Sequence, residues 1–406
     1  MDEDTAVLVD RLIRCNNKFA LQLFKRICTH CSNILVSPLS VSSVLAMLLV
    51  GARGQTETQL KQILHLQEFS LTEDEDENAN DDNANGNSQI HLAYRHLLNS
   101  ITETGNTGLN AANRLYIQED VAFDGSVSDY LAENYGADVG CADFARAGDE
   151  ARAQINDWVS EKIGTDSWQQ GLVGEGVVDL FTTLVAITAT TFLGEWQFPF
   201  NEGATCLYPF NAGGGRKIVI DLMHTPSCCE FRTAFNDDLN CQLVELPYKE
   251  DRFAMLLIIP SEHEDLHVFE DKIDVDILDA LVGQLEPSSI KIALPRFRVA
   301  CTFSLSDIIG DMGAGLVLNP DSADLTGFTA SNEEGVCLSA LIHGTELRVI
   351  EKGTEYSPST PQDSDESEDE GNEIVVDRPF IFILRDTKSG LILFTGCIHE
   401  PSTEEM

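Results

Sequence analysis

Cysteines form the first pattern in this sequence that could support chemistry. Cys28 and Cys31 make a C-x-x-C pair, and Cys228 and Cys229 are adjacent. Such pairs hold zinc or exchange disulfides, but a zinc site needs further ligands, and no second pair has matching spacing. The eleven cysteines are odd in number and follow no disulfide framework, which is typical of thiols in a reducing compartment. We therefore expect no metal site and no cofactor.

No other pattern is typical of catalysis. The glycine-rich stretch at 171–176 lacks the spacing of a dinucleotide site, and the chain has no P-loop. His91 and His96 are five residues apart on a predicted helix, so their side chains do not share a face, and we interpret them as surface residues. No serine lies in a nucleophile-elbow sequence. The sequence predicts that the protein is not an enzyme.

Acidic residues dominate the charge of the chain. Its 406 residues include 67 Asp and Glu against 26 Lys and Arg, which gives a formal net charge of −41. The tracts 72–82 and 363–373 each hold seven acidic residues and no basic one. Such a field repels nucleic acid and anionic membranes and favours cationic partners. Long polar loops of this kind are either functional or disordered.

Helical patterns precede strand patterns along the chain. Apolar residues at helical spacing from Leu8 to Ile27 predict an amphipathic helix, and 38–52 reads as a buried helix too short to span a bilayer. From about Leu184 short apolar runs predict strands, and 380–396 a closing hairpin. This order predicts an α+β fold. The acidic N-terminus is not typical of a signal peptide, so we expect a cytoplasmic or nucleocytoplasmic protein.

Seven stretches, spread over nearly the whole chain and in the family's order, resemble the serpin family of protease inhibitors. The resemblance implies one domain, residues 1–406, with about nine helices and three β-sheets. A short N-terminal lead and a polar loop at 72–89 between helices resemble the intracellular, ovalbumin-type branch. The stretches are Asn33–Leu64, Asn110–Tyr116, Ile155–Ile163, Thr190–Trp196, Gln242–Tyr248, Glu351–Glu355 and Asp377–Pro401.

The resemblance implies that residues 353–376 form a reactive-centre loop, which a protease attacks as a substrate. The cleaved loop then inserts into the main sheet as a new strand and carries the acylated protease with it. The stored free energy of the starting fold drives this switch. The implied function is suicide inhibition of an intracellular serine or cysteine protease.

The functional residues that the resemblance implies fall into three groups. The hinge of the loop comprises Glu351, Gly353, Thr354, Glu355, Tyr356, Pro358 and Pro361. The residues that control loop insertion are Ser37, Ser40, Thr188, Trp196 and His343, with Thr188 standing where the family usually has asparagine. The candidates for the reactive bond are Ser367, Glu368, Asp369 and Glu370.

Alternation along the hinge predicts how the loop would insert. If Thr354 faces the core, most acidic residues of the loop face outward, because successive strand residues face opposite sides. Pro358 and Pro361 each remove one ladder hydrogen bond, at a cost of about 1 kcal/mol. Tyr356 is large where inhibitory serpins have small residues. A non-inhibitory serpin whose acidic loops bind a cationic partner or serve regulation is therefore the alternative function.

The resemblance and the charge also predict the partners. The expected partner is a target protease that prefers acidic residues, since no base lies in 367–370. We expect no nucleic acid, no membrane and no heparin, because the helix near 90–105 offers one arginine and two histidines instead of a basic face. The protein is expected to be a monomer.

Overall fold

The computed structural model describes residues 2–28, 33–70, 82–102, 107–165, 168, 171–212, 215–261, 266–330, 335–355 and 372–402. The described α-helices are α1 (Glu3–Ile27), α2 (Pro38–Gly51), α3 (Gly54–Ile63), α4 (Asp82–Thr102), α5 (Gly125–Tyr135), α6 (Gly148–Ile163), α7 (Leu266–Lys272), α8 (Val275–Gly283) and α9 (Ser306–Ile309). The described strands are β1 (Ile34–Val36), β2 (Gly108–Gln118), β3 (Asp138–Ala142), β4 (Leu184–Glu195), β5 (Asn201–Asn211), β6 (Lys217–His224), β7 (Cys229–Asn236), β8 (Cys241–Pro247), β9 (Phe253–Pro260), β10 (Glu286–Pro295), β11 (Phe297–Ser304), β12 (Leu338–Ile350), β13 (Gly353–Glu355), β14 (Glu373–Val375), β15 (Phe380–Asp386) and β16 (Ile392–Ile398).

Local sequence explains the two N-terminal helices. At the start of α1, Asp2 accepts a hydrogen bond from the Thr5 amide at 2.8 Å, and the basic residues Lys25 and Arg26 lie in the last turn. Both features stabilise a helix terminus. Helix α2 begins with Pro38, which suits the first turn, and almost all its side chains are buried. It is therefore the central helix of the core.

The larger sheet has the strand order β1-β16-β15-β9-β8-β7-β10-β6-β5, with β14 added beside β10. Strand β10 joins its two parts, because Glu286–Ile290 pairs with β7 whereas Ala293–Pro295 pairs with β6. The three sheets implied by the resemblance therefore merge here into two networks. Strands β9, β15 and β16 are buried along their whole length.

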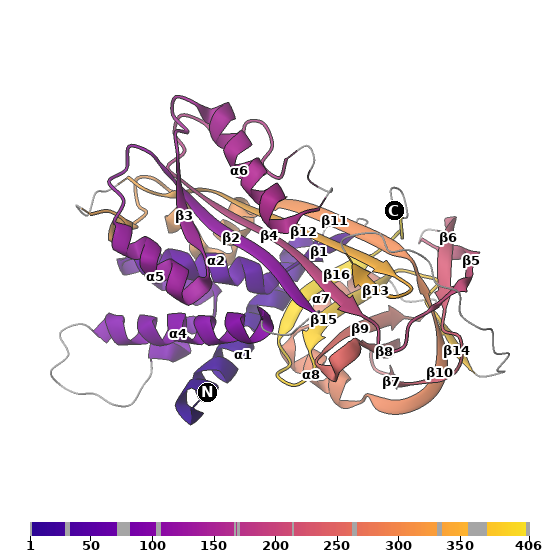
Figure 1. Ribbon diagram of the computed structural model, residues 1–406. Coiled ribbons are helices and arrows are strands. Elements are labelled where there is room, and N and C mark those ends of the chain that lie inside the picture. Colours follow the sequence, from indigo (N-terminus) through magenta and orange to yellow (C-terminus); the bar gives the residue numbers. More distant parts are fainter. Residues whose placement is uncertain are drawn as a thin grey trace.

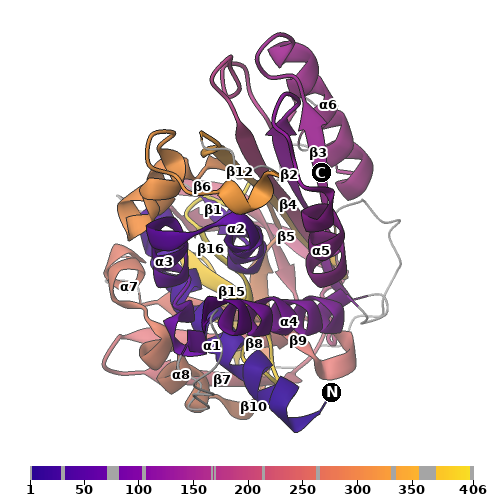
Figure 2. The same cartoon turned by 90° about the vertical axis from the view of Figure 1, so that its left-hand side faces the viewer.

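The smaller sheet has the order β11-β12-β13-β4-β2-β3. Figures 1 and 2 show α6 against one face of this sheet, with α2 on the other face. On β4, Leu184 and Ala186 pack with the α2 side, whereas Val185 and Ile187 pack with α6. Strand β4 is thus buried on both faces, which explains its nearly continuous apolar and threonine-rich sequence.

The predicted α+β class is confirmed, and two local expectations differ. Helix α4 begins at Asp82, so 82–89 of the predicted polar loop is helical, and 71–81 lies outside the described residues. An acidic residue at a helix N-terminus favours this start. The surface interpretation of His91 was wrong, because the side chain is buried and its Nδ1 lies 2.7 Å from the Tyr135 hydroxyl. Burial is the main cause that lowers the pKa of His91, to about 4.

Candidate functional site

The ends of the predicted reactive loop lie in different sheets. Strand β13 leads into the loop from the smaller sheet, and β14 receives the chain in the larger sheet, where it runs parallel to β10. Figure 1 shows the two strands well apart. Residues 356–371 lie outside the described residues, and with them Tyr356, Pro358, Pro361, Ser367, Glu368, Asp369 and Glu370.

The hinge residues form a short strand between β4 and β12. Thr354 pairs with Gly194 of β4 and with Val349 of β12, and both pairings are antiparallel. Further along, β4 and β12 pair directly with each other in parallel, from Leu184 and Leu338 to Thr191 and Glu346. The seam between the two strands is therefore closed along most of its length, and β13 occupies its open end.

Gly353 must be glycine for the hinge to enter the seam. A Cβ atom at this position would lie 2.0 Å from the Gly194 carbonyl oxygen and 2.8 Å from the Glu195 Cα. Both contacts are to backbone, which cannot rotate away as a flexible side chain could. The absence of a side chain thus permits the close approach of two backbones.

A buried aromatic pair holds the hinge threonine. The Thr354 hydroxyl lies 2.6 Å from the Tyr248 hydroxyl, and neither side chain is exposed to solvent. The Tyr248 ring stacks on Trp196 with centroids 4.4 Å apart, and Trp196 Nε1 donates to the Ile350 carbonyl at 3.0 Å. Sequence reasoning missed Tyr248, although a buried tyrosine hydroxyl requires a partner and could have signalled its role.

The turn between β12 and β13 is anchored by charge. The buried Glu351 carboxylate pairs with Arg296 and accepts a hydrogen bond from Thr205 at 2.6 Å. Its neighbour Lys352 lies 3.6 Å from Glu202. A buried carboxylate is retained only where it is paired, so Arg296 and Thr205 fix the turn. Neither residue could be selected from the sequence, because Thr205 on β5 and Arg296 between β10 and β11 are both distant from Glu351 along the chain.

A polar cluster lies under the closed part of the seam. The Ser37 amide donates to His343 Nε2 at 3.0 Å, and the Ser40 hydroxyl lies 3.1 Å from that of Ser37 and accepts from Thr190 at 2.8 Å. His343 and Thr188 face each other across β12 and β4. The structure therefore brings together Ser37, Ser40, Thr188 and His343, four of the residues to which the resemblance gives a role in loop insertion.

His343 is neutral in this cluster. Burial lowers its pKa to about 3, and Nε2 accepts a hydrogen bond, so the proton resides on Nδ1. Among the described residues, neither His343 Nδ1 nor the Thr188 hydroxyl has a hydrogen-bond partner. Buried polar groups without partners are destabilising, so this pair weakens the closed seam.

Comparisons with known proteins agree with this architecture. The family model described as Serpin (serine protease inhibitor) matches residues 14–401, and the chain belongs to the serpin family. Leukocyte elastase inhibitor from Sus scrofa is 31% identical, over 97% of this chain and 100% of the relative. Serpin B9 from Homo sapiens is 28% identical, with the same coverage of each chain. These relatives are ovalbumin-type serpins, so the predicted resemblance to the ovalbumin-type branch is confirmed.

Solved structures show the same fold. Uncleaved ovalbumin has a TM-score of 0.81 at 23% identity, over 96% of this chain and 99% of its own. Mouse protein-Z dependent protease inhibitor has a TM-score of 0.84 at 21% identity, over 99% of this chain and 100% of its own. Among the described residues, no helix has the length and apolarity needed to cross a membrane.

Proposed function

We propose that this serpin is a suicide-substrate inhibitor of an endopeptidase. The observation that carries the proposal is β13, which already lies as an antiparallel strand between β4 and β12 at the open end of the seam. Cleavage within 367–370 would free the loop to extend this strand. Each added residue would exchange the direct parallel pairing of β4 and β12 for antiparallel pairing on both sides, and this gain drives insertion.

The register of β13 defines where the loop residues would go. Each step forward from Thr354 moves one residue back along both β4 and β12, starting from Gly194 and Val349. Thr360 would then lie between Thr188 and His343, on the face of the polar cluster. The Thr360 hydroxyl can both donate and accept a hydrogen bond. Insertion would therefore supply a partner for His343 Nδ1 and for the Thr188 hydroxyl, which have none among the described residues in the uncleaved state.

The same register identifies the obstacles to insertion. Tyr356 would face the core beside Phe192, while Pro358 and Pro361 would each leave one backbone carbonyl of a neighbouring strand without a donor. The two prolines are three residues apart, so one hydrogen bond is lost to β4 and one to β12. Each lost hydrogen bond costs about 1 kcal/mol. Insertion remains favourable if the new antiparallel pairs outweigh these costs.

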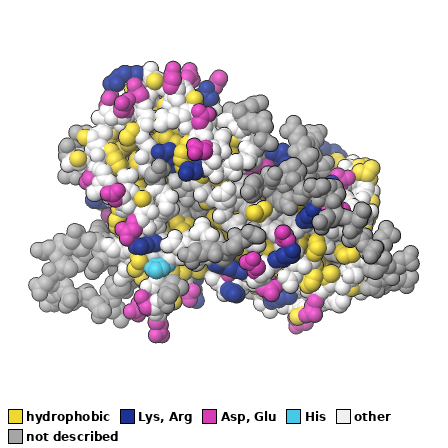
Figure 3. Space-filling view, viewed as in Figure 1, with side chains coloured by type: hydrophobic (Ala, Val, Ile, Leu, Met, Phe, Trp, Pro, Cys, Tyr) yellow, Lys and Arg dark blue, Asp and Glu magenta, His cyan; other side chains and the backbone are white. Residues whose placement is uncertain are grey.

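The target protease is proposed from the residues at 367–370. Glu368 and Asp369 suit a protease that prefers acidic residues, and a trypsin-like protease lacks a base to recognise. Relatives named leukocyte elastase inhibitor make an elastase-type protease the second class to test, with the small Ser367 as its cleavage site. Acidic and basic side chains intermingle on the face shown in Figure 3. Because the described residues on this face show no region of one charge, we propose that the loop residues select the target protease.

We further propose that the protein is a cytoplasmic monomer. Its inhibitory activity needs no metal and no cofactor, and heparin does not activate it. On α4, Arg95 pairs with Glu133 at 2.7 Å and His91 is buried, so the helix supports no basic binding face. The odd number of cysteines without a disulfide framework suits a reducing compartment. The negative net charge disfavours nucleic acid and anionic membranes.

Cleavage of the loop followed by thermal unfolding tests the proposal. A Glu- or Asp-specific protease should cut within 367–370, and the cleaved protein should unfold tens of degrees above the intact one because the loop has become a strand. In a separate experiment, a target protease added to the intact protein should form a covalent complex that survives denaturing electrophoresis. Cleavage without any rise in the midpoint would contradict inhibition and favour the non-inhibitory alternative.

A further inference from the structure

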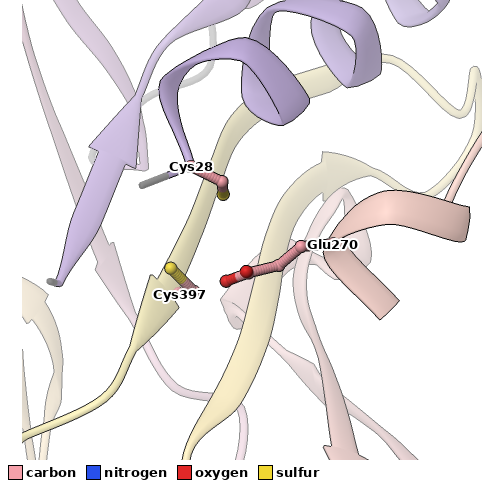
Figure 4. Close-up of side chains that lie close together, drawn as sticks. All are labelled: Cys28, Glu270 and Cys397. Atoms are coloured by element: carbon pink, nitrogen blue, oxygen red, sulfur yellow. The ribbon is translucent and has the colours of Figure 1, made fainter. Parts of the chain in front are cut away.

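A group of metal-ligating side chains lies outside the hinge, where the end of α1, α7 and β16 meet. Cys28 follows the last turn of α1, Glu270 lies on α7 and Cys397 on β16. One ligand atom from each lies within 4.8 Å of the others. Figure 4 shows the two sulfur atoms and the carboxylate pointing toward one another. Cys28 thus lies beside two possible ligands that are far away in the sequence.

His399 adjoins this group as a fourth possible ligand. Its Nε2 lies 3.5 Å from the Glu270 carboxylate, and its side chain also hydrogen-bonds to Cys397. Ligands held at about 2.0 to 2.3 Å by a tetrahedral zinc lie about 3.3 to 3.8 Å apart, so the His399–Glu270 separation already matches. The ligand atoms of Cys28, Cys397 and Glu270 lie within 4.8 Å of one another, so they need to approach by about an ångström or less. His399 is not part of this convergent set, so its ring must also move toward it.

The backbone at Cys397 and His399 is held by hydrogen bonds. Cys397 is paired on both sides, with Ile34 of β1 and Ile381 of β15. The Asn33 side chain accepts from the His399 amide at 2.8 Å and donates to the Glu400 carbonyl at 2.6 Å, which fixes the chain at His399. Ligands carried by paired strands and helices are held more precisely than ligands on loops.

Burial and ligand chemistry restrict the occupant. Glu270 and Cys397 are almost completely buried, whereas Cys28 and His399 are partly accessible and provide a route of entry. Two sulfurs, one imidazole and one carboxylate suit a soft or borderline transition-metal ion and not calcium or magnesium, which require oxygen ligands. Tetrahedral coordination by cysteine and histidine is the usual geometry for zinc.

We propose that Cys28, Cys397, Glu270 and His399 bind one zinc ion, which ties the end of α1 and α7 to the C-terminal strand β16. On binding, each thiol releases its proton to solvent, and histidine binds as the neutral imidazole. The ion connects the N-terminal and C-terminal ends of the fold and stabilises the folded state by mass action.

A second group with the same residue types provides a matched control. Cys206 Sγ lies 3.6 Å from His224 Nε2, but Glu373 lies 2.8 Å from the opposite ring nitrogen, Nδ1. Since the two partners contact different nitrogens of one ring, their ligand atoms cannot converge on one ion. Cys206 is also exposed. The substitution Cys206→Ser therefore removes an accessible thiol beside a histidine without touching the proposed site.

Metal binding to the reduced full-length protein tests the proposal. Bound metal is first removed with a chelator, and Zn²⁺ is then added back. After desalting, one equivalent of Zn²⁺ should remain bound and raise the thermal midpoint by a few degrees. Co²⁺ should give a thiolate charge-transfer band and visible bands of tetrahedral cobalt. Cys28→Ser, at a partly accessible position, should abolish the thiolate charge-transfer band of Co²⁺. His399→Asn should weaken Zn²⁺ binding at least tenfold. Cys206→Ser should leave the cobalt band and the Zn²⁺ affinity unchanged.

Three outcomes would overturn the zinc site. They are no retained metal, a cobalt band that survives Cys28→Ser and Cys397→Ser, or a band lost only with Cys206→Ser. A Cys28–Cys397 disulfide found by peptide mass spectrometry in reducing, metal-free buffer would also exclude it. Circular dichroism of each variant separates loss of the site from loss of the fold.

Discussion

The hydroxyl of Thr354 lies 2.6 Å from that of Tyr248, and both are shielded from solvent beneath the open end of the seam between β4 and β12. Tyr248 in turn stacks on Trp196, which holds the Ile350 carbonyl. The first residue pairs of the inserted hinge are thus stabilised by a side-chain contact that exists only when the hinge lies in the sheet.

Tyr248→Phe should favour release of the hinge. The substitution retains the ring that stacks on Trp196 but leaves the buried Thr354 hydroxyl without this partner, a cost of about 1 to 3 kcal/mol. Hydrogen exchange at the amides of β13 should accelerate, and the thermal midpoint of the uncleaved protein should change little. Tyr208→Phe on β5 is the control, and equal exchange in the two variants would show that the Tyr248 hydroxyl does not hold the hinge.

Gly353→Ala should block entry of the hinge. Its Cβ would lie 2.0 Å from the Gly194 carbonyl oxygen, so β13 cannot keep its register. After loop cleavage, the rise in thermal midpoint should be much smaller than in the unsubstituted protein. Gly125→Ala, where a Cβ meets no atom within 4 Å, is the matched control. A full rise in Gly353→Ala would mean that insertion does not start from this register.

Thr188→Asn should strengthen the closed seam. The new amide oxygen can accept from His343 Nδ1, which has no partner among the described residues, and one such bond contributes about 1 kcal/mol. We expect a higher midpoint for the uncleaved protein and slower loop insertion. Thr188→Val, which removes the hydroxyl without adding an acceptor, is the control. A nitrogen resonance of His343 Nδ1 that does not respond to Thr188→Asn would rule out the new bond.

The stability of the uncleaved protein should fall in acid partly because of His343 and His91. Burial lowers their pKa values from 6.5 to about 3 and about 4. Below about pH 6.5 both histidines bind a proton in the unfolded chain but stay neutral in the folded chain. Their contribution is therefore complete above that pH and is lost toward pH 3 to 4, with a slope of up to about 1.4 kcal/mol per pH unit for each histidine.

Denaturant unfolding between pH 7 and 5 measures this dependence. His343→Gln keeps an acceptor for the Ser37 amide but does not titrate, so its stability should fall less steeply than that of the unsubstituted protein. His96→Gln on α4 serves as the control for a half-buried histidine. Parallel slopes in His343→Gln and the unsubstituted protein would assign the acid sensitivity to carboxylates instead.

Apolar periodicity sufficed to predict most elements, because it records which face of each element is buried. The strands expected from about Leu184 onward begin with β4 (Leu184–Glu195), and the closing hairpin is β15 and β16. The hinge stretch Glu351–Glu355 was also identified from the sequence, through its resemblance to the family. His91 was misplaced, since helical periodicity cannot show that Tyr135 from α5 covers one more turn of α4.

The sequence by itself determined the α+β class, the serpin family, the two acidic tracts and the positions of Gly353 and Thr354. These properties depend on local patterns or on motifs within short stretches. Only the tertiary structure decided that Tyr248 and Arg296 hold the hinge, that Thr188 faces His343, and that Cys28 meets Cys397. Such contacts join residues far apart in the chain, and their geometry arises only when the sheets and helices pack together.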